Sequence, residues 1–212
     1  MSNKKTSPLL ARLKNLARTI NPRDPAWIFL GLVIMAGLII FYQIIPSGFL
    51  SSSNKLMLVT IEHQKKDIKH LDQERDTFAT DSFYIDTIDF PGGNVLRHEK
   101  LGNYDFSKNF FMRIEGTMEV LTAGSYRMIV SSDDGFRLEI DGAVLSQHTN
   151  DRPMAETVTN IHLEKGQHPF VVHYFQGFGQ LGLQAWYDGS CGKKLFGESS
   201  PCIRFITKPK AP

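Results

Sequence analysis

The chain has 212 residues, of which 42% are apolar and 11% aromatic, so it can form a hydrophobic core and is not a disordered protein. Its net charge of +2 combines +5 in the first 26 residues with −3 in the remainder. The basic character belongs to the N-terminal segment and is no argument for nucleic-acid binding by the rest of the chain.

Residues 1–26 form a basic segment with an amphipathic pattern. Between residues 7 and 20, apolar residues recur at helical spacing with basic residues between them. This pattern predicts a short amphipathic helix on the cytoplasmic membrane surface, where basic side chains meet anionic lipids. A disordered basic tail is the alternative, because isolated helices of this length are marginal.

Residues 27–45 carry no charge over 19 consecutive positions. As a helix they would span roughly 29 Å, close to the thickness of the hydrocarbon core of a bilayer. Trp27 and Tyr42 stand near the two ends, where they suit the membrane interfaces. We therefore predict a transmembrane helix. A cleaved signal peptide is the alternative, but the apolar run exceeds the usual length of about 7–15 residues and no Ala-x-Ala site follows it.

The charge distribution around this segment predicts its orientation. Basic residues are concentrated before the span, which places the N-terminus in the cytoplasm by the positive-inside rule. The chain is then a single-pass protein of the cytoplasmic (inner) membrane with a periplasmic or extracellular C-terminal domain. A mitochondrial presequence is also basic and poor in acidic residues, so the mitochondrial inner membrane is the alternative location.

Residues 46–77 are expected to form a stalk or linker. Residues 56–61 fit either a short strand or a continued helix, and residues 62–75 are dense in charge. Ile68 and Leu71 are the only later apolar residues of this segment. The charged stretch is most simply the solvated face of a helix.

From Phe78 onward, short alternating segments are separated by turn-forming residues, which predicts a mainly β, antiparallel sandwich. In the segment after Gly135, the side chains of Phe136, Leu138 and Ile140 are expected to face the core. Asp141 and Gly142 then fit a type I′ hairpin turn, which needs positive φ at both positions.

Residues 131–142 read Ser-Ser-Asp-Asp-Gly-Phe-Arg-Leu-Glu-Ile-Asp-Gly. This stretch resembles the centre of the protective-antigen (PA-14) β-sandwich domain. Residues 110–120 and 123–128 resemble the entry strands of that family, and residues 165–175 and 182–187 resemble its closing hairpin. The resemblance covers residues 78–187. It implies a sandwich over residues 78–190 that serves recognition, often of carbohydrate.

In the adhesin branch of that family, two adjacent aspartates joined by a cis peptide bond hold a calcium ion that coordinates sugar hydroxyls. The resemblance assigns this role to Asp133 and Asp134, and adjacent carboxylates suit a hard cation that prefers oxygen ligands. In the alternative reading the two aspartates only cap the turn by accepting hydrogen bonds from backbone amides.

The second loop of the expected site departs from that branch. It reads Gln-Gly-Phe-Gly-Gln over residues 176–180 and offers the side chains of Gln176 and Gln180 where those adhesins supply an asparagine. Phe178 lies between two glycines, where it is placed either to stack on a sugar ring or to fold back over the sheet edge. Tyr174 and Trp186 are expected to belong to the core.

Residues 191–212 are expected to form a C-terminal extension. Cys191 and Cys202 are the only cysteines, and both lie on the predicted exported side. A disulfide closing a loop of about 12 residues is the natural interpretation, with two buried free thiols as the alternative. A zinc site is not expected, because no His or Cys lies beside them at ligand spacing.

The sequence contains no nucleophile-elbow, P-loop or HExxH motif, so we do not expect an enzyme. The first hypothesis is a membrane-anchored protein that recognises glycan or cell-envelope polysaccharide through Asp133, Asp134 and the 176–180 loop. The alternative is an accessory subunit of an inner-membrane complex, whose domain contacts neighbouring membrane-protein subunits. The missing loop asparagine favours this alternative.

Overall fold

The computed structural model describes residues 35, 56–99, 102–104 and 107–207. The chain divides into two units, Met1–Ser52 and Ser53–Pro212, and all strands of the described residues lie in the second. The predicted amphipathic helix and, apart from the helical residue Met35, the predicted membrane span lie outside the described residues. Within the described ranges, no helix has the length and apolar character needed to cross a membrane.

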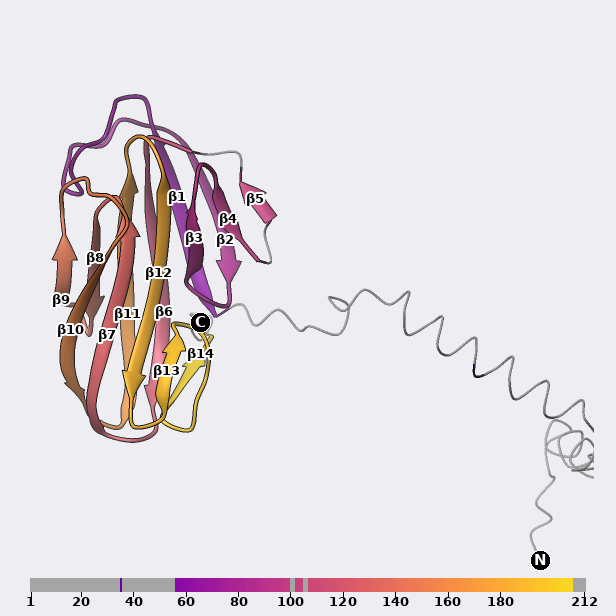
Figure 1. Cartoon of the computed structure of the whole chain (residues 1–212), viewed down its shortest axis with the longest axis vertical. Helices are drawn as coiled ribbons and strands as arrows, with labels where there is room; N and C mark the ends of the chain where they lie inside the picture. The colour runs from indigo at the N-terminus through magenta and orange to yellow at the C-terminus, as the bar shows by residue number, and fades with distance from the viewer. Residues whose placement is uncertain (1–34, 36–55, 100–101, 105–106, 208–212) are drawn as a thin grey trace, which may run out of the picture. The chain divides into compact units, whose positions relative to one another are not determined.

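Two antiparallel sheets form the body of the second unit (Figure 1). The first sheet has the order β2-β1-β6-β11-β8-β9, with β14 also paired to β6: β1 (Met57–Gln64), β2 (Thr77–Ile85), β6 (Phe110–Val120), β8 (Phe136–Ile140), β9 (Ala143–His148), β11 (Gly166–Gln176) and β14 (Ile203–Ile206). The second has the order β10-β7-β12-β13, with β3 also paired to β12: β3 (Asp89–Gly93), β7 (Gly124–Asp133), β10 (Ala155–Leu163), β12 (Leu181–Gly189) and β13 (Gly192–Leu195). A separate pair consists of β4 (Leu96–His98) and β5 (Gly102–Tyr104).

The two sheets are built on the same plan around β6 and β12. One side of β6 pairs with β11 along its length, and the other side pairs first with β1 and then with β14. One side of β12 pairs with β7, and its other side pairs first with β3 and then with β13. Two strands arranged end to end therefore complete each sheet, beside β6 in the first and beside β12 in the second.

Alternation of buried and exposed side chains explains why these segments form strands. Strand β8 alternates strictly, with Phe136, Leu138 and Ile140 buried in the core, as the sequence predicts. Positive φ angles of 55° at Asp141 and 78° at Gly142 turn the chain into β9, which confirms the predicted hairpin. Tyr174 is fully buried as expected, whereas Trp186 is only half-buried because its neighbours Ala185 and Tyr187 are the residues of β12 that face inward.

The predicted stalk is wrong from Met57 onward, because β1 is an interior strand of the first sheet. It pairs with β2 on one side and β6 on the other, and Met57, Val59 and Ile61 are fully buried. Alternation at these three positions is the pattern of a strand with one buried face. The sequence allowed a short strand at residues 56–61, but the dense charge that follows it favoured a stalk over a place in the sandwich.

Residues 65–76 fold as a loop over the outer face of the first sheet, and no helix forms there. Ile68 and Leu71 are buried in a small second core with Phe111 and Phe175. The carboxylate of Asp72 accepts two hydrogen bonds of 2.9 Å from the guanidinium of Arg137 on β8. The charges of this loop hold it against the sheet.

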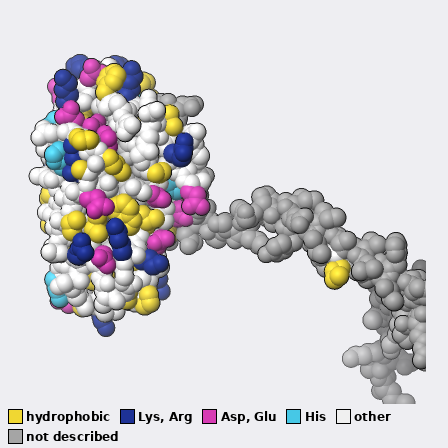
Figure 2. Space-filling view, in the orientation of Figure 1, with side chains coloured by type: hydrophobic (Ala, Val, Ile, Leu, Met, Phe, Trp, Pro, Cys, Tyr) yellow, Lys and Arg dark blue, Asp and Glu magenta, His cyan; other side chains and the backbone are white. Residues whose placement is uncertain are grey.

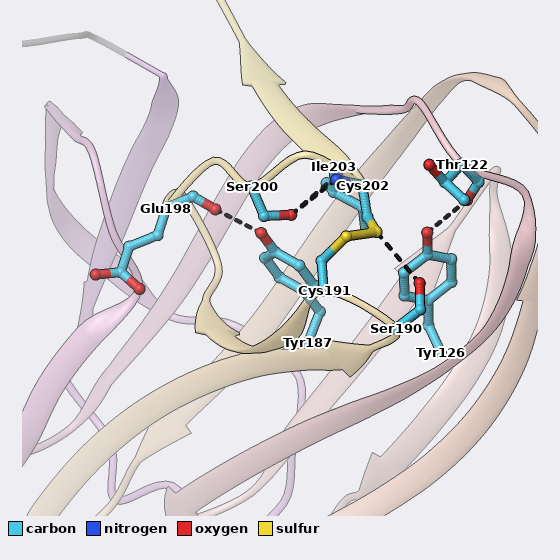
Figure 3. Close-up of a disulfide and its surroundings, with 9 residues drawn as sticks. All are labelled: Thr122, Tyr126, Tyr187, Ser190, Cys191, Glu198, Ser200, Cys202 and Ile203. Carbon is cyan, nitrogen blue, oxygen red and sulfur yellow. Dashed lines mark hydrogen bonds between the residues drawn. A yellow bond between two sulfur atoms is a disulfide. The ribbon is translucent and has the colours of Figure 1, made fainter.

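The C-terminal extension is also part of the sandwich. Cys191 and Cys202 form the predicted disulfide, which ties the start of β13 to the start of β14 (Figure 3). Phe196 and Phe205 enter the core, with ring centroids 5.8 Å apart. The Tyr187 hydroxyl donates to the carbonyl of Glu198 at 2.8 Å. Buried aromatic rings therefore anchor a segment that the sequence suggests only as an appendage.

The importance of β1 can be tested by shortening the chain. A chain that begins at Phe78 lacks three fully buried aliphatic side chains of β1, each worth about 1.5–3 kcal/mol of burial. Their sum is a large share of the about 5–15 kcal/mol that holds a typical domain together. We expect this chain to show no cooperative thermal unfolding by circular dichroism, while a chain that begins at Ser53 unfolds cooperatively. Equal melting temperatures would contradict the assignment of β1 to the core.

A second prediction concerns His168, whose two ring nitrogens both face acceptors. Nδ1 lies 2.7 Å from the Asp141 carboxylate and Nε2 lies 2.9 Å from the carbonyl oxygen of Glu164. Burial alone would lower the pKa of His168, but these two contacts outweigh it and raise the pKa above the usual value of 6.5. The resulting stability is fully present below about pH 6.5 and is lost as the pH rises through the folded-state pKa.

We expect His168→Gln to flatten this fall in the free energy of unfolding with rising pH. Urea titrations between pH 5 and pH 8 measure it, because this range extends about 1.5 units to either side of the usual histidine pKa. His162→Gln is the matched control, because His162 lies on β10, the strand that precedes β11 in the sequence, and its side chain is exposed. An unchanged slope in His168→Gln would refute the proposed imidazolium.

Candidate functional site

The aspartates predicted to form a site lie where β7 ends and β8 begins. Asp133 is the last residue of β7, and the peptide bond that joins it to Asp134 is cis. Their exposed fractions are 8% and 4%. Such deep burial of two carboxyl groups requires that the surrounding chain supply hydrogen-bond donors.

Backbone amides from two other loops supply those donors. Asp133 Oδ2 accepts a hydrogen bond from the amide of Met154 at 3.2 Å, and Asp134 Oδ2 accepts one from the amide of Gly177 at 2.8 Å. The Ser132 hydroxyl donates to the backbone carbonyl of Asp134 at 2.6 Å. The two carboxylates do accept hydrogen bonds from backbone amides, as the capping interpretation expects, but these amides belong to loops distant in sequence and not to the turn itself.

The buried side chains of Tyr174 and Gln176 hold the 176–180 loop in place. The Tyr174 hydroxyl contacts the backbone oxygen of Asp133 and lies 2.7 Å from Gln176 Oε1. Gln176 Nε2 donates to the carbonyl of Gln180 at 3.0 Å. Gln176 is fully buried, so its side chain shapes the loop and presents no atom to a ligand at the surface.

Two glycines are required by close approach in this region. A Cβ on Gly135 would lie 2.5 Å from the Phe175 ring and 2.6 Å from the carbonyl oxygen of His148. A Cβ on Gly177 would lie 2.4 Å from the carbonyl oxygen of Ile68. The loop of residues 65–76 thus packs directly behind the second site loop and limits how far it can move.

These loops line a cavity of about 440 Å³ that is open to the surface. Of the predicted residues, Asp133, Asp134, Phe178 and Gln180 line it, and Gln176 does not. Sequence reasoning missed the third wall, which is made by Asp151, Arg152 and Pro153. The turn composition of this segment, between two alternating stretches, was a signal for a loop, but only the sheet topology places that loop beside the aspartates.

Arg152 brings a half-buried positive charge to the base of the site. Its guanidinium donates to the hydroxyl of Ser132 at 2.9 Å and to that of Thr157 at 3.0 Å, and it lies 5.3 Å from the centre of the Phe136 ring. Burial lowers the pKa of Arg152, and the negative charge of Asp133 opposes that shift. The cation partly balances the aspartates without forming a direct ion pair with either in the described residues.

Burial dominates the electrostatics of the two aspartates. It raises the pKa of Asp133, against the opposing effects of the Met154 amide and of Arg152. It raises the pKa of Asp134 to about 6, and the adjacent charge of Asp133 adds to the shift while the hydrogen bond from Gly177 opposes it. The pair therefore holds protons more tightly than two exposed carboxylates would, and when ionised it needs a donor or a cation to compensate its buried charge.

Phe178 stands at the rim with 64% of its surface exposed, and the ammonium group of Lys108 lies 4.9 Å from the centre of its ring. The ring does not fold back into the core. An exposed aromatic side chain beside buried carboxylates provides one apolar surface and several hydrogen-bond acceptors within one cavity, which is the usual composition of a small-ligand site.

The donor set is of the kind that calcium prefers, namely carboxylate, amide and carbonyl oxygens. Asp133 and Asp134 would be the charged ligands, each with one oxygen not engaged by the two amides above. Among the described residues, however, no three or more His, Cys, Asp or Glu side chains converge as a metal-binding group. A calcium ion here would depend on backbone, water or ligand oxygens for the rest of its six to eight contacts.

Another cavity lies at the opposite end of β7, with a volume of about 330 Å³. Its two charged side chains, Arg127 and Asp188, are paired with each other at 3.3 Å. Their charges are thus largely satisfied within the protein. This contrast favours the cavity beside Asp133 and Asp134 as the functional one.

Several solved structures have a similar fold. One is the PA14 domain of the antifreeze protein MpAFP, with 14% identity, coverage of 74% of this chain and 94% of that chain, and a TM-score of 0.53. Another is the PA14 sugar-binding domain from an RTX adhesin, with 15% identity, coverage of 69% and 93%, and a TM-score of 0.51. A third is the A domain of epithelial adhesin 9 from Candida glabrata in complex with Galb1-3GlcNAc, with 10% identity, coverage of 73% and 92%, and a TM-score of 0.52.

At these identities the likeness establishes the fold alone. A search of curated proteins found no match. The family itself is shown by the sequence, because the model of the PA14 domain matches residues 76–190, more than half of the chain. The resemblance read from the paired aspartates and the flanking strands is confirmed: the chain belongs to the PA14 domain family.

Proposed function

We propose that this chain is a noncatalytic saccharide-binding protein that uses the cavity at Asp133 and Asp134. The observation that carries the proposal is the meeting of these two carboxylates with Phe178 and Gln180 around one cavity, although they come from loops distant in sequence. The sugar-binding and disaccharide-bound PA14 structures named above support the same ligand class.

The chemistry of the cavity suits a sugar. Each sugar hydroxyl can donate one hydrogen bond and accept up to two. The cavity presents carboxylate acceptors, the side chain of Gln180 and the exposed ring of Phe178. A pyranose has a face of C–H groups that can lie on such a ring while its hydroxyls reach the polar wall. Burial of Asp133 and Asp134 strengthens each hydrogen bond that they accept.

Calcium is included in this proposal as a cation held by Asp133 and Asp134. It would contact the sugar hydroxyls and replace part of their hydration. The nearby charge of Arg152 offsets part of the negative charge of the pair, so the affinity for calcium is expected to be moderate.

We also propose that the chain is anchored in the cytoplasmic membrane by residues 27–45. The support is the 19-residue uncharged run, with basic residues concentrated before it. The domain would then be presented on the periplasmic or extracellular side, where cell-envelope polysaccharide is available as a ligand.

Saccharide binding is tested by screening the full-length protein in detergent against an array of glycans. Replacing both aspartates by asparagine keeps side-chain oxygens that can accept hydrogen bonds from the backbone amides but removes the two negative charges. Since a hydrogen bond to a charged group is worth about 1.5–3 kcal/mol, we expect at least about a tenfold loss of affinity for the best glycan. Phe178→Ala should weaken binding without lowering the melting temperature, because the ring is exposed. Sugar release is assayed alongside, and turnover would contradict a noncatalytic role.

Matched controls are Asp188→Asn and Tyr84→Ala, which change a carboxylate and an exposed aromatic ring away from the cavity. Adding a chelator to the wild-type protein tests the role of calcium separately from saccharide binding. If the glycan still binds with chelator present, calcium is not required and the proposal of saccharide recognition remains. A wild-type protein that binds no glycan would reject the proposal and favour the accessory-subunit alternative.

The membrane orientation makes a separate prediction. A reporter that is active only in the cytoplasm should be silent when fused after Pro212 and active when fused before Met1, because the positive charges precede the uncharged run. The N-terminal fusion is the control for expression. Activity of the C-terminal fusion would overturn the orientation.

A further inference from the structure

The cavity beside Asp133 and Asp134, named the first cavity, has a neighbour at the same end of the sandwich. This neighbour, named the second cavity, has a volume of about 520 Å³. It is formed by the end of β1, the start of β2 and the residues just before β6. The β1–β2 connection and the β11–β12 turn lie together at the end drawn uppermost in Figure 1, where Figure 2 shows hydrophobic, basic and acidic side chains intermixed. None of the predicted site residues lines this cavity.

Two phenylalanines single out this end of the molecule. Phe78, in the second cavity, and Phe178, in the first, are the most exposed large hydrophobic side chains among the described residues, at 60% and 64%. Phe78 stands on the edge strand β2 with its ring centroid 6.0 Å from that of His63. Each cavity therefore has its own exposed aromatic surface.

Residues 107–109 connect the two cavities physically. Lys108 lines the second cavity, and its ammonium group lies over the ring of Phe178 in the first. The amide of Asn109 donates to the carbonyl of Gly177 at 3.0 Å, so this segment is bonded to the second loop of the first site. Lys108 therefore contacts both cavities.

The polar groups around Phe78 include both hydrogen-bond donors and hydrogen-bond acceptors. Lys65 and Lys108 contribute ammonium donors, and Asp67 contributes a carboxylate whose Oδ1 is oriented by a 2.9 Å hydrogen bond from Asn109 Nδ2. Lys65 also lies 3.7 Å from Asp76. Because Asp76 partly compensates the charge of Lys65, donors and acceptors stand around one aromatic ring, and this combination suits a ring that carries hydroxyl groups.

We propose that the cavity at Phe78 is a second saccharide subsite, in which a neutral pyranose unit stacks on Phe78 and hydrogen-bonds to the groups around it. The proposal rests on saccharide binding at Asp133 and Asp134, and it extends the ligand class to an oligosaccharide that spans Lys108. Two linked units that bind two adjacent subsites have a high effective concentration for each other, so a longer ligand binds more tightly without any stronger individual contact.

The test uses the full-length protein and saturation-transfer NMR with the methyl glycosides of glucose, galactose, mannose and N-acetylglucosamine at millimolar concentration. Asp133→Asn with Asp134→Asn weakens the first site. In that background, Phe78→Ala is compared with Tyr84→Ala, which removes another exposed ring at the far end of the same strand. We expect saturation transfer to persist in the double variant, to disappear with Phe78→Ala and to remain with Tyr84→Ala.

The same variants in the wild-type background are then titrated with oligosaccharides of the glycoside that binds. Phe78→Ala should lower the affinity for the longer ligands by about tenfold or more and leave that for the monosaccharide at the first site unchanged. Transfer that is absent from the double variant, or that survives Phe78→Ala, overturns the second subsite while wild-type binding still supports the first. A wild-type protein without any transfer rejects both sites.

Discussion

The candidate site depends on one constraint, the attachment of the 176–180 loop to the turn at Asp133 and Asp134. Tyr174 is fully buried between them, and its hydroxyl contacts the Asp133 backbone oxygen and lies close to the Gln176 side chain. The amide of Gly177 completes the link by donating to the Asp134 carboxylate. Because buried polar groups are costly unless they are paired, these contacts hold both loops in one arrangement before any ligand arrives. The saccharide then meets a largely formed cavity, and little ordering of the chain opposes binding.

The framework of the sandwich separates this site from the elements that close the fold. Strand β6 begins at Phe110, which pairs with Gln176 at the site, and ends at Val120, which pairs with Ile203 near the disulfide. The disulfide and the aromatic rings of Phe196 and Phe205 therefore stabilise the opposite end. The site end is held instead by hydrogen bonds and by the loop of residues 65–76. Recognition residues on loops of a rigid β-scaffold are a general solution for binding proteins.

Local patterns in the sequence were sufficient to predict the elements whose conformation depends on neighbouring residues. The alternation in β8 and the positive φ angles of its hairpin each follow from a few adjacent residues, whereas the glycines beside Phe178 left open whether its ring is exposed. The stalk was wrong because the charges of residues 62–76 look solvated in sequence, whereas Asp72 pairs with Arg137 from a distant strand. Arg152 was missed for the same reason. Its proximity to Asp133 arises from the pairing of β7 with β10, which no local pattern reveals.

The central claim is that a saccharide binds between the Asp133–Asp134 turn and the 176–180 loop. The most direct measurement is the change in backbone amide chemical shifts when the ¹⁵N-labelled full-length protein is titrated with the best-binding saccharide. The amides of Met154 and Gly177 report on this cavity because they donate to the two carboxylates. Our account predicts that these two amides, and that of Phe178, shift in a saturable manner. Shifts confined to the cavity at Arg127 and Asp188, at the other end of β7, would contradict it.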